Sequence, residues 1–348
     1  MGLIFVNPLL SFMRYNPWQK SGATLMSATL CKFLPRGLLK RRRDDGPKVF
    51  FEKSAASAVG VVPVKTQDIP QVHYGVEDLI TKLDPYKTPA ISITYPGRFQ
   101  SIDGVGFLGG YPVLPSALRW PYADFEDLRI AGGEPMHFIG QFDLAQLPVL
   151  TGAKYRLPTR GILYFFVHAS DRAWQKTSGA TLKFYKTRVL YSGANPQGLE
   201  IRPAPAEMPP AMGNVSVSSQ DLPQGILPNR PVAFQPVWSV PGPAFTKTHL
   251  QQSGSEPIFA PGDFLMAADR ICGVQNVHNP APGAYALGYG ADNRTQKDFP
   301  DIAGYILLMQ FNTDANMHWF WGEHGALQIW IRPEDLASHD FSRVIAIS

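Results

Sequence analysis

A short segment of the chain occurs twice in nearly the same form. Residues 138–143 read Phe-Ile-Gly-Gln-Phe-Asp, and residues 307–312 read Leu-Leu-Met-Gln-Phe-Asn. Each copy is followed by a second segment rich in β-branched and aromatic residues, at 161–167 and at 325–331. Such segments favour strands. The sequence therefore predicts two similar β units around one core, with an amide side chain at the same place in each.

The composition favours short strands joined by irregular loops over long helices. Charged residues make up 17% of the 348 residues, below the roughly 25% of average soluble proteins. Aromatic residues reach 12%, and the chain holds 31 glycines and 32 prolines, which interrupt helices and mark turns. We expect an α+β fold: a strand-rich, mixed and mainly antiparallel sheet with an internal pseudo-repeat of two similar β units and few short helices.

Local patterns place individual elements. Residues 76–83 carry apolar side chains at helical spacing, with acidic residues early and Pro85 just beyond, which predicts a short helix. Two prolines and three glycines in residues 106–115 predict a structured loop without a regular strand. Further strands are predicted at 90–95, 136–143, 161–168, 182–191, 233–240, 302–311, 326–331 and 344–347, and a first helical turn at 333–336.

Positive charge is concentrated at the start of the chain. Residues 1–43 contain eight Lys and Arg residues and no Asp or Glu, so the remaining 305 residues carry 24 basic and 28 acidic side chains, a net charge of −4. Nucleic-acid-binding domains concentrate Lys and Arg on their own surface, so we expect no nucleic acid to bind the body. We expect residues 1–70 to be a flexible, disordered basic leader and residues 71–348 a single domain. A targeting segment and an anchor for anionic lipid are the alternatives for residues 1–43.

Cysteine content and motif searches exclude several classes. Only Cys31 and Cys272 are present, which excludes a disulfide framework and a cysteine-based metal site. No apolar run approaches the roughly 20 residues that span a bilayer, so we expect a soluble, cytoplasmic protein with no transmembrane segment. The sequence also contains neither a phosphate-binding loop nor the Gly-x-Ser-x-Gly pattern of serine hydrolases. We therefore expect no cofactor.

The repeated segments supply the first candidate site. Side chains alternate between the two faces of a strand, so Gln141 and Asp143 point the same way, as do Gln310 and Asn312. If the two units are related by a pseudo-twofold axis, the four side chains converge on a polar pocket and bind a ligand. In the alternative, each amide satisfies the backbone of a neighbouring loop inside a dry core.

A second group of candidates lies near the end of the chain, where His318, Glu323 and His324 surround Trp319 and Trp321. The spacing matches no helix-borne zinc motif, and the two histidines of one strand would lie about 20 Å apart at roughly 3.3 Å per residue, so no metal site is expected. A glutamate and a histidine can still act as an acid–base pair. The aromatic cluster offers either a stacking platform, with Trp321 as the ligand-binding candidate, or a core anchor.

Several unusual motifs occur in the same order as in one known family. They are Gly-Gly-Tyr-Pro at 109–112 with Trp-Pro at 120–121, the segment 138–148, Arg-Gly-Ile-Leu-Tyr-Phe-Phe at 160–166, Leu-Met-Gln-Phe at 308–311, Trp-Gly-Glu-His-Gly at 321–325 and Glu-Asp-Leu at 334–336. Over residues 85–348 the chain resembles the YwqG-like domain family. The resemblance implies a strand-rich α+β fold, a bacterial origin and an uncharacterised biochemical role. Some members resemble partners in toxin and immunity gene neighbourhoods.

The expected function follows from this combination. We expect a non-catalytic binding protein that takes a protein partner or a small ligand, with an immunity or regulatory role in bacteria. The alternative is an enzyme of unknown reaction that uses His318, Glu323 or His324 as an acid–base pair and the two repeated glutamines as orienting groups. A catalytic site would bring several titratable groups together, and the sequence does not show such a group.

Overall fold

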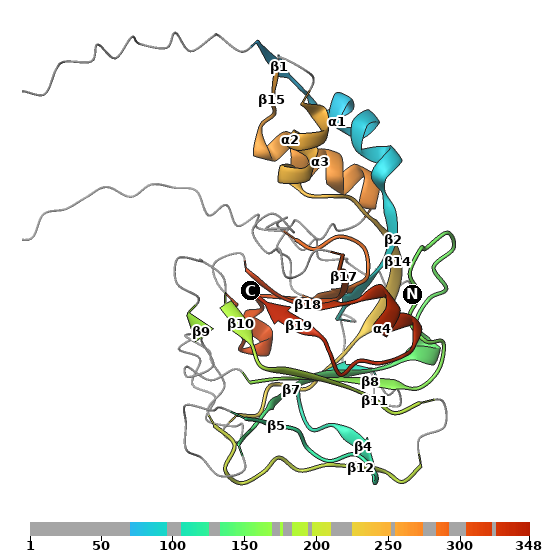
Figure 1. Ribbon diagram of the computed structural model, residues 1–348, viewed down its shortest axis with the longest axis vertical. Helices are drawn as coiled ribbons and strands as arrows, with labels where there is room; N and C mark the ends of the chain where they lie inside the picture. The colour runs from blue at the N-terminus through green and yellow to red at the C-terminus, as the bar shows by residue number, and fades with distance from the viewer. Residues whose placement is uncertain are drawn as a thin grey trace, which may run out of the picture. The chain divides into compact units, whose positions relative to one another are not determined.

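The computed structural model describes the chain in eleven stretches (Figure 1): residues 70–95, 106–124, 133–168, 175–176, 183–193, 197–209, 225–251, 255–273, 283–291, 304–321 and 325–348. The chain divides into two units, Met1–Lys65 and Thr66–Ser348. The first unit lies wholly outside the described residues, and with it almost all of the predicted leader at 1–70. The leader therefore stays a prediction, and every element below belongs to the second unit.

Two antiparallel sheets form the framework. The eight-stranded sheet contains, in spatial order, β14 (Ala233–Ser239), β2 (Thr88–Thr94), β16 (Ala284–Ala286), β17 (Ile306–Asn312), β18 (Ala326–Ile331), β19 (Ile345–Ile347), β10 (Lys183–Tyr185) and β9 (Gln175–Lys176). The five-stranded sheet contains β11 (Thr187–Tyr191), β8 (Ile162–Val167), β7 (His137–Asp143), β3 (Phe107–Leu108) and β13 (Arg230–Pro231). Every neighbouring pair in both sheets is antiparallel.

Three short strand pairs complete the sheet structure. They are β4 (Val113–Pro115) with β12 (Leu199–Ile201), β5 (Tyr122–Ala123) with β6 (Glu134–Pro135), and β1 (Gln71–His73) with β15 (Glu256–Ile258). The last pair is parallel. The expected strand-rich, mainly antiparallel fold with few short helices is therefore confirmed.

Two chain segments pass from one sheet to the other. β13 lies at one edge of the five-stranded sheet, and after Val232 the chain continues as β14 at the edge of the eight-stranded sheet. Near the opposite edges, β10 leads through Lys186 into β11, so the strand predicted at 182–191 is divided between the sheets. Strands that switch sheets form the corners of β-sandwiches. The two sheets are thus joined covalently on both sides.

The main hydrophobic core lies between these sheets. Phe165 of β8 and Phe311 of β17 contact each other edge to face, with ring centroids 5.6 Å apart. Phe142 of β7 meets Phe234 of β14 at 5.7 Å. In Figure 1, strands β17, β18 and β19 run on one side of this core, and β7, β8 and β11 run on the other. Both predicted hairpins therefore contribute to one core, as expected.

The five-stranded sheet is also covered on its outer face. Phe138, Tyr164 and Phe166 pack there against Trp120 and Met136 in a second cluster. Because both faces are covered, all six residues of β8 are buried. A strand that is buried on both sides favours a continuous apolar run over alternation, which explains the sequence of residues 162–167.

The β7–β8 and β17–β18 hairpins match in local geometry. Each pairs a seven-residue strand with a six-residue strand. The register shifts between Phe138 and Gly140 in the first hairpin and between Leu307 and Met309 in the second. These are the same step of the two similar sequences. The flanking strands β3 and β16 also lie in matching register against β7 and β17.

Four α-helices occur among the described residues: α1 (Val76–Leu83), α2 (Pro243–Leu250), α3 (Pro261–Cys272) and α4 (Pro333–Ala337). Both α1 and α4 lie where the sequence predicts a helix or a helical turn. Leu79 and Leu83 of α1 pack against Phe264, Ala267 and Ala268 of α3 in a cluster separate from the main core. The same cluster buries Cys272 at the end of α3.

The segment 106–115 differs from its prediction as a loop without a strand. Phe107 and Leu108 form β3, which pairs with β7 on one side and β13 on the other. The strand ends after two residues because Gly109 and Gly110 both adopt positive φ, at 64° and 69°. The same segment also contains β4, which pairs with β12. An irregular glycine-rich segment can therefore still contribute short strands.

Candidate functional site

Gln141 holds the backbone of β4 at its first residue, Val113. Its side-chain oxygen Oε1 accepts a hydrogen bond from the N–H of Val113 at 2.7 Å. Tyr164, the cross-strand partner of Gln141, donates its hydroxyl to the carbonyl oxygen of the same Val113 at 3.0 Å. Both backbone groups of Val113 are thus held by two paired side chains of the five-stranded sheet.

Gln310 makes the same kind of contact with a loop that follows β16. Its Oε1 accepts a hydrogen bond from the N–H of Ala291 at 2.7 Å. Gln328, the cross-strand partner of Gln310, donates from Nε2 to the carbonyl oxygen of Ala291. Each glutamine therefore satisfies the backbone of a neighbouring segment, which is β4 for Gln141 and a loop for Gln310.

The two glutamines do not converge on a common pocket. Phe142 and Phe311, which directly follow Gln141 and Gln310, point into the core between the sheets. Because neighbouring side chains of a strand point to opposite faces, each glutamine lies on the outer face of its own sheet. Both are fully buried, at 0% exposure. The expectation of convergence was wrong, since it took a shared core to imply a shared polar face.

The other ligand-binding candidates make local contacts. Asp143 Oδ1 accepts a hydrogen bond from the N–H of Ala145 at 3.0 Å and caps the 3-10 helix η2 (Leu144–Gln146). Asn312 Oδ1 accepts one from Nε2 of Gln310 at 2.7 Å. Trp321 is buried in the main core, and its indole N–H has no partner among the described residues. Ligand binding by these residues stays a prediction.

The predicted acid–base candidates are only partly described. His318 is half-buried and has a positive φ of 54°, where it ends the 3-10 helix η4 (Ala315–Met317). Glu323 and His324 lie outside the described residues. Of the surrounding aromatic residues, Trp319 is buried and donates its indole N–H to the carbonyl oxygen of Asn312 at 2.8 Å. The alternative of an enzyme at this position therefore stays a prediction.

A buried histidine pair that the sequence did not single out lies beside the five-stranded sheet. Rings of His137 and His168 lie 6.2 Å apart and are both fully buried. His168 Nε2 lies 2.8 Å from a carboxylate oxygen of Glu134, and His137 Nε2 donates to the carbonyl oxygen of Pro209 at 2.9 Å. Burial lowers the pKa of His137 to about 4 and also lowers the pKa of His168. Both rings are thus held neutral in the fold near pH 7.

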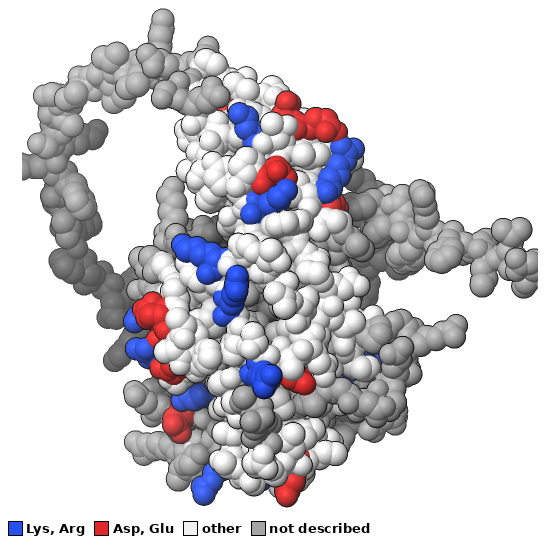
Figure 2. Space-filling model, turned by 90° about the vertical axis from the view of Figure 1, so that its right-hand side faces the viewer, with Lys and Arg blue, Asp and Glu red and all other residues white. Residues whose placement is uncertain are grey.

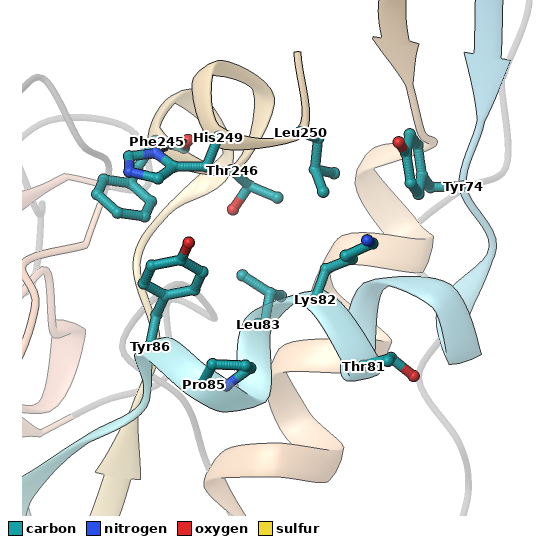
Figure 3. Close-up of a pocket in the computed structure, with 10 residues that line it drawn as sticks. All are labelled: Tyr74, Thr81, Lys82, Leu83, Pro85, Tyr86, Phe245, Thr246, His249 and Leu250. Atoms are coloured by element: carbon teal, nitrogen blue, oxygen red, sulfur yellow. Dashed lines mark hydrogen bonds between the residues drawn. The ribbon is translucent and has the colours of Figure 1, made fainter. Parts of the chain in front are cut away.

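A cavity of about 350 Å³ lies between α1 and α2 (Figure 3), and we call it the α1–α2 pocket. Its volume is at the lower end of the range for small-molecule sites, which is roughly 300 to 1,000 Å³. The lining residues combine aromatic rings, aliphatic side chains and one lysine: Tyr74, Thr81, Lys82, Leu83, Pro85, Tyr86, Phe245, Thr246, His249 and Leu250.

Local sequence explains how the pocket is built. α1 buries Leu79 and Leu83, and the chain then tightens into the 3-10 helix η1 (Asp84–Tyr86), which brings Tyr86 to the pocket. On the other side α2 begins with Pro243, whose fixed φ suits the first helical position. α2 is not among the predicted elements because it has little amphipathic pattern. The sequence feature that could have indicated this helix is Pro243 at its first position.

Three rings form one end of the pocket. Phe245 and His249 are one helical turn apart on α2 and stack with centroids 3.5 Å apart and an interplanar angle of 16°. His249 Nδ1 donates to the carbonyl oxygen of Phe245 at 3.0 Å, which fixes the imidazole in this position. Tyr86 stands nearly perpendicular to both rings, at 5.5 Å from Phe245 and 5.4 Å from His249. The rings together form a right-angled aromatic corner.

Two further cavities lie elsewhere. One of about 460 Å³ is lined mainly by prolines and alanines of residues 203–209, and its only carboxylate, Glu207, accepts a hydrogen bond from Tyr122. Another of about 510 Å³ lies beside β11, where Tyr191 packs against His339 and Phe341. The first cavity has no Lys or Arg in its lining, and in the second Arg188 is accompanied by the carboxylate of Asp340. The α1–α2 pocket combines an aromatic corner with a lysine and no carboxylate, so it is the stronger candidate.

The surface charge and the metal-ligand residues do not point to a further site in the described part of the chain. On the face shown in Figure 2, Lys and Arg side chains are interspersed with Asp and Glu side chains among wide uncharged areas. Within the described ranges, no three or more His, Cys, Asp or Glu side chains are placed to hold a metal ion. No helix in the described part of the chain has the length and apolar character needed to cross a membrane.

Comparison with known proteins identifies the domain. The model of DUF1963, a domain of unknown function, matches residues 106–348. No curated protein sequence matches the chain. The match contains both sheets except β2, so the α1–α2 pocket takes its α2 side from the matched region and its α1 side from the residues before it. The chain belongs to the DUF1963 family.

Proposed function

We propose that the protein is a non-catalytic binding protein and that a small ligand occupies the α1–α2 pocket. The aromatic corner of Tyr86, Phe245 and His249 carries this proposal. Rings that serve only to join two helices are normally buried, whereas Tyr86 is 41% exposed. Its hydroxyl also has no hydrogen-bond partner in the described chain. Exposed rings at a fixed right angle can receive the face and the edge of a planar ligand.

Ligand-observed NMR with the full-length protein and a set of small aromatic compounds tests this proposal. We expect saturation transfer to the compounds, and Tyr86→Ala should weaken binding because it removes one wall of the corner. Phe320→Ala is the matched control, since Phe320 is 39% exposed and does not line the pocket. Equal binding by both variants would place the ligand elsewhere and contradict the proposal.

We also infer a finer family assignment and a repeat. The motifs at 109–112 and 321–325 support a YwqG-like member of DUF1963. The shared register shift and the matching glutamine contacts to Val113 and Ala291 support an internal repeat of one β unit. An immunity or regulatory role in bacteria rests on the sequence resemblance alone.

A further inference from the structure

We infer that the ligand of the α1–α2 pocket is a planar aromatic ring that carries one anionic group, a carboxylate or a phosphate. This inference rests on the proposed function. The ring would lie in the aromatic corner, and the anionic group would contact Lys82 and Tyr74 at the opposite end. Figure 3 shows the Lys82 ammonium and the Tyr74 hydroxyl on one side of the pocket and the three rings on the other.

The charge of the lining supports an anionic ligand. Lys82 lines the pocket, and no Asp or Glu does. The acidic residues of α1 and η1 all have other partners: Glu77 pairs with Arg270, Asp78 Oδ2 accepts a hydrogen bond from the N–H of Gly75 at 3.2 Å, and Asp84 pairs with Lys87. No described residue forms an ion pair with Lys82 itself. The pocket therefore presents one positive charge that the described protein does not neutralise.

Tyr74 supplies a neutral donor at the same end. Its side chain is 9% exposed and packs in the hydrophobic cluster that α1 and α3 form. Its backbone N–H donates a hydrogen bond to the carbonyl oxygen of Ile258 at 2.9 Å. The hydroxyl has no partner among the described side chains. A lysine ammonium and a tyrosine hydroxyl can together donate two hydrogen bonds to one oxyanion.

The size and shape of the cavity limit the rest of the ligand. About 350 Å³ accommodates one ring system with one substituent. Leu83 and Leu250 form the apolar middle of the lining, and the hydroxyl of Thr246 already donates to the carbonyl oxygen of Gly242 at 2.9 Å. The middle of the pocket thus favours an apolar link between the ring and the anion.

Three probes with the same apolar link test the inference by calorimetry on the full-length protein: 3-phenylpropanoate, 2-phenylethyl phosphate and neutral 3-phenylpropan-1-ol. We expect the two anions to bind roughly three- to tenfold more tightly than the alcohol. The anion gains one attraction to the Lys82 ammonium, which solvent and salt partly screen. Lys82→Gln should remove this preference and leave the affinity for the neutral alcohol unchanged. Tyr86→Ala should weaken all three. The tighter of the two anions identifies the anionic group.

Lys247→Gln is the matched control, because it removes one positive charge from α2 at a residue that packs over Phe259 and does not line the pocket. It should keep the preference for anions. Equal affinity for the three probes, or equal loss of the preference in both lysine variants, would overturn the inference while the proposed binding function stands. Failure of all three probes to bind the folded wild-type protein would instead overturn the proposed function.

Discussion

At the scale of single residues, two buried glutamine side chains accept hydrogen bonds from backbone N–H groups of neighbouring segments. Val113 is the first residue of the short strand β4, and Ala291 lies in the segment that follows β16. Each has its N–H and its carbonyl oxygen held by side chains. A backbone group that is buried without a partner costs about as much as a lost hydrogen bond. Gln141 and Gln310 therefore fix β4 and one irregular loop against the outer faces of the sheets.

We expect Gln141→Ala and Gln310→Ala each to lower the free energy of unfolding by about 1 to 3 kcal/mol, because each leaves a partly buried N–H without its acceptor. Urea denaturation followed by tryptophan fluorescence measures the loss. Gln235→Ala, at an exposed position of β14, should change it by less than about 0.5 kcal/mol. A loss in only one of the two buried variants would show that the contacts are not equivalent.

The buried histidines predict a pH dependence of stability. Burial holds the pKa of His137 at about 4 in the fold, whereas an exposed histidine of the unfolded chain titrates near 6.5. Between these values the unfolded state binds more protons, so stability falls as the pH falls from about 6.5 to 4. The shift corresponds to roughly 3 kcal/mol. His168 adds a loss in the same direction, and Glu134, its carboxylate partner, opposes part of it.

Urea denaturation at pH 7, 6 and 5 tests this dependence. The wild-type protein should lose stability steadily across the series. His137→Gln keeps a side-chain donor for the carbonyl oxygen of Pro209 but cannot titrate, so its stability should depend less on pH. An identical slope in the wild type and in this variant would show that His137 does not supply the effect.

At the scale of elements, the loop after β3 depends on glycine. Gly109 has a φ of 64°, and a Cβ at this position would overlap the carbonyl oxygen of Pro228. Gly109→Ala should therefore cost the roughly 1 to 2 kcal/mol of a left-handed conformation plus about 1 to 3 kcal/mol of overpacking. Gly152→Ala is the control, because its φ is 78° but nothing lies within 4 Å. Thermal denaturation that shows equal losses would contradict the steric argument.

Predictability from the sequence also differs between elements. α1 and the β7, β8 and β18 strands were predicted within about one residue, because their patterns are local. α2 was missed, and Phe245 and His249 with it, because the pocket is made by contacts between elements far apart in the chain. The sequence likewise predicts that Gln141 and Asp143 lie on the same face of their strand. It does not predict whether that face is the inner or the outer one.

At the scale of the whole folded unit, the two sheets cannot separate without breaking one core. The segments that contain β13–β14 and β10–β11 join the sheets on both sides, and Phe165 of one sheet packs on Phe311 of the other. Each β unit has a strand pattern of its own, yet neither buries its inner face alone. We therefore expect both sheets to unfold in one transition.

Phe165→Ala tests this expectation from the five-stranded sheet. Removing a fully buried ring should cost about 3 to 5 kcal/mol. Because the core is shared, hydrogen exchange followed by mass spectrometry should show the same loss of protection in β17 and β18 as in β7 and β8. Val149→Ala is the control, since Val149 is 85% exposed. Protection that persists in β17 and β18 while β7 and β8 exchange would mean that the eight-stranded sheet is stable without its partner, and that the joined edges link two independent folding units.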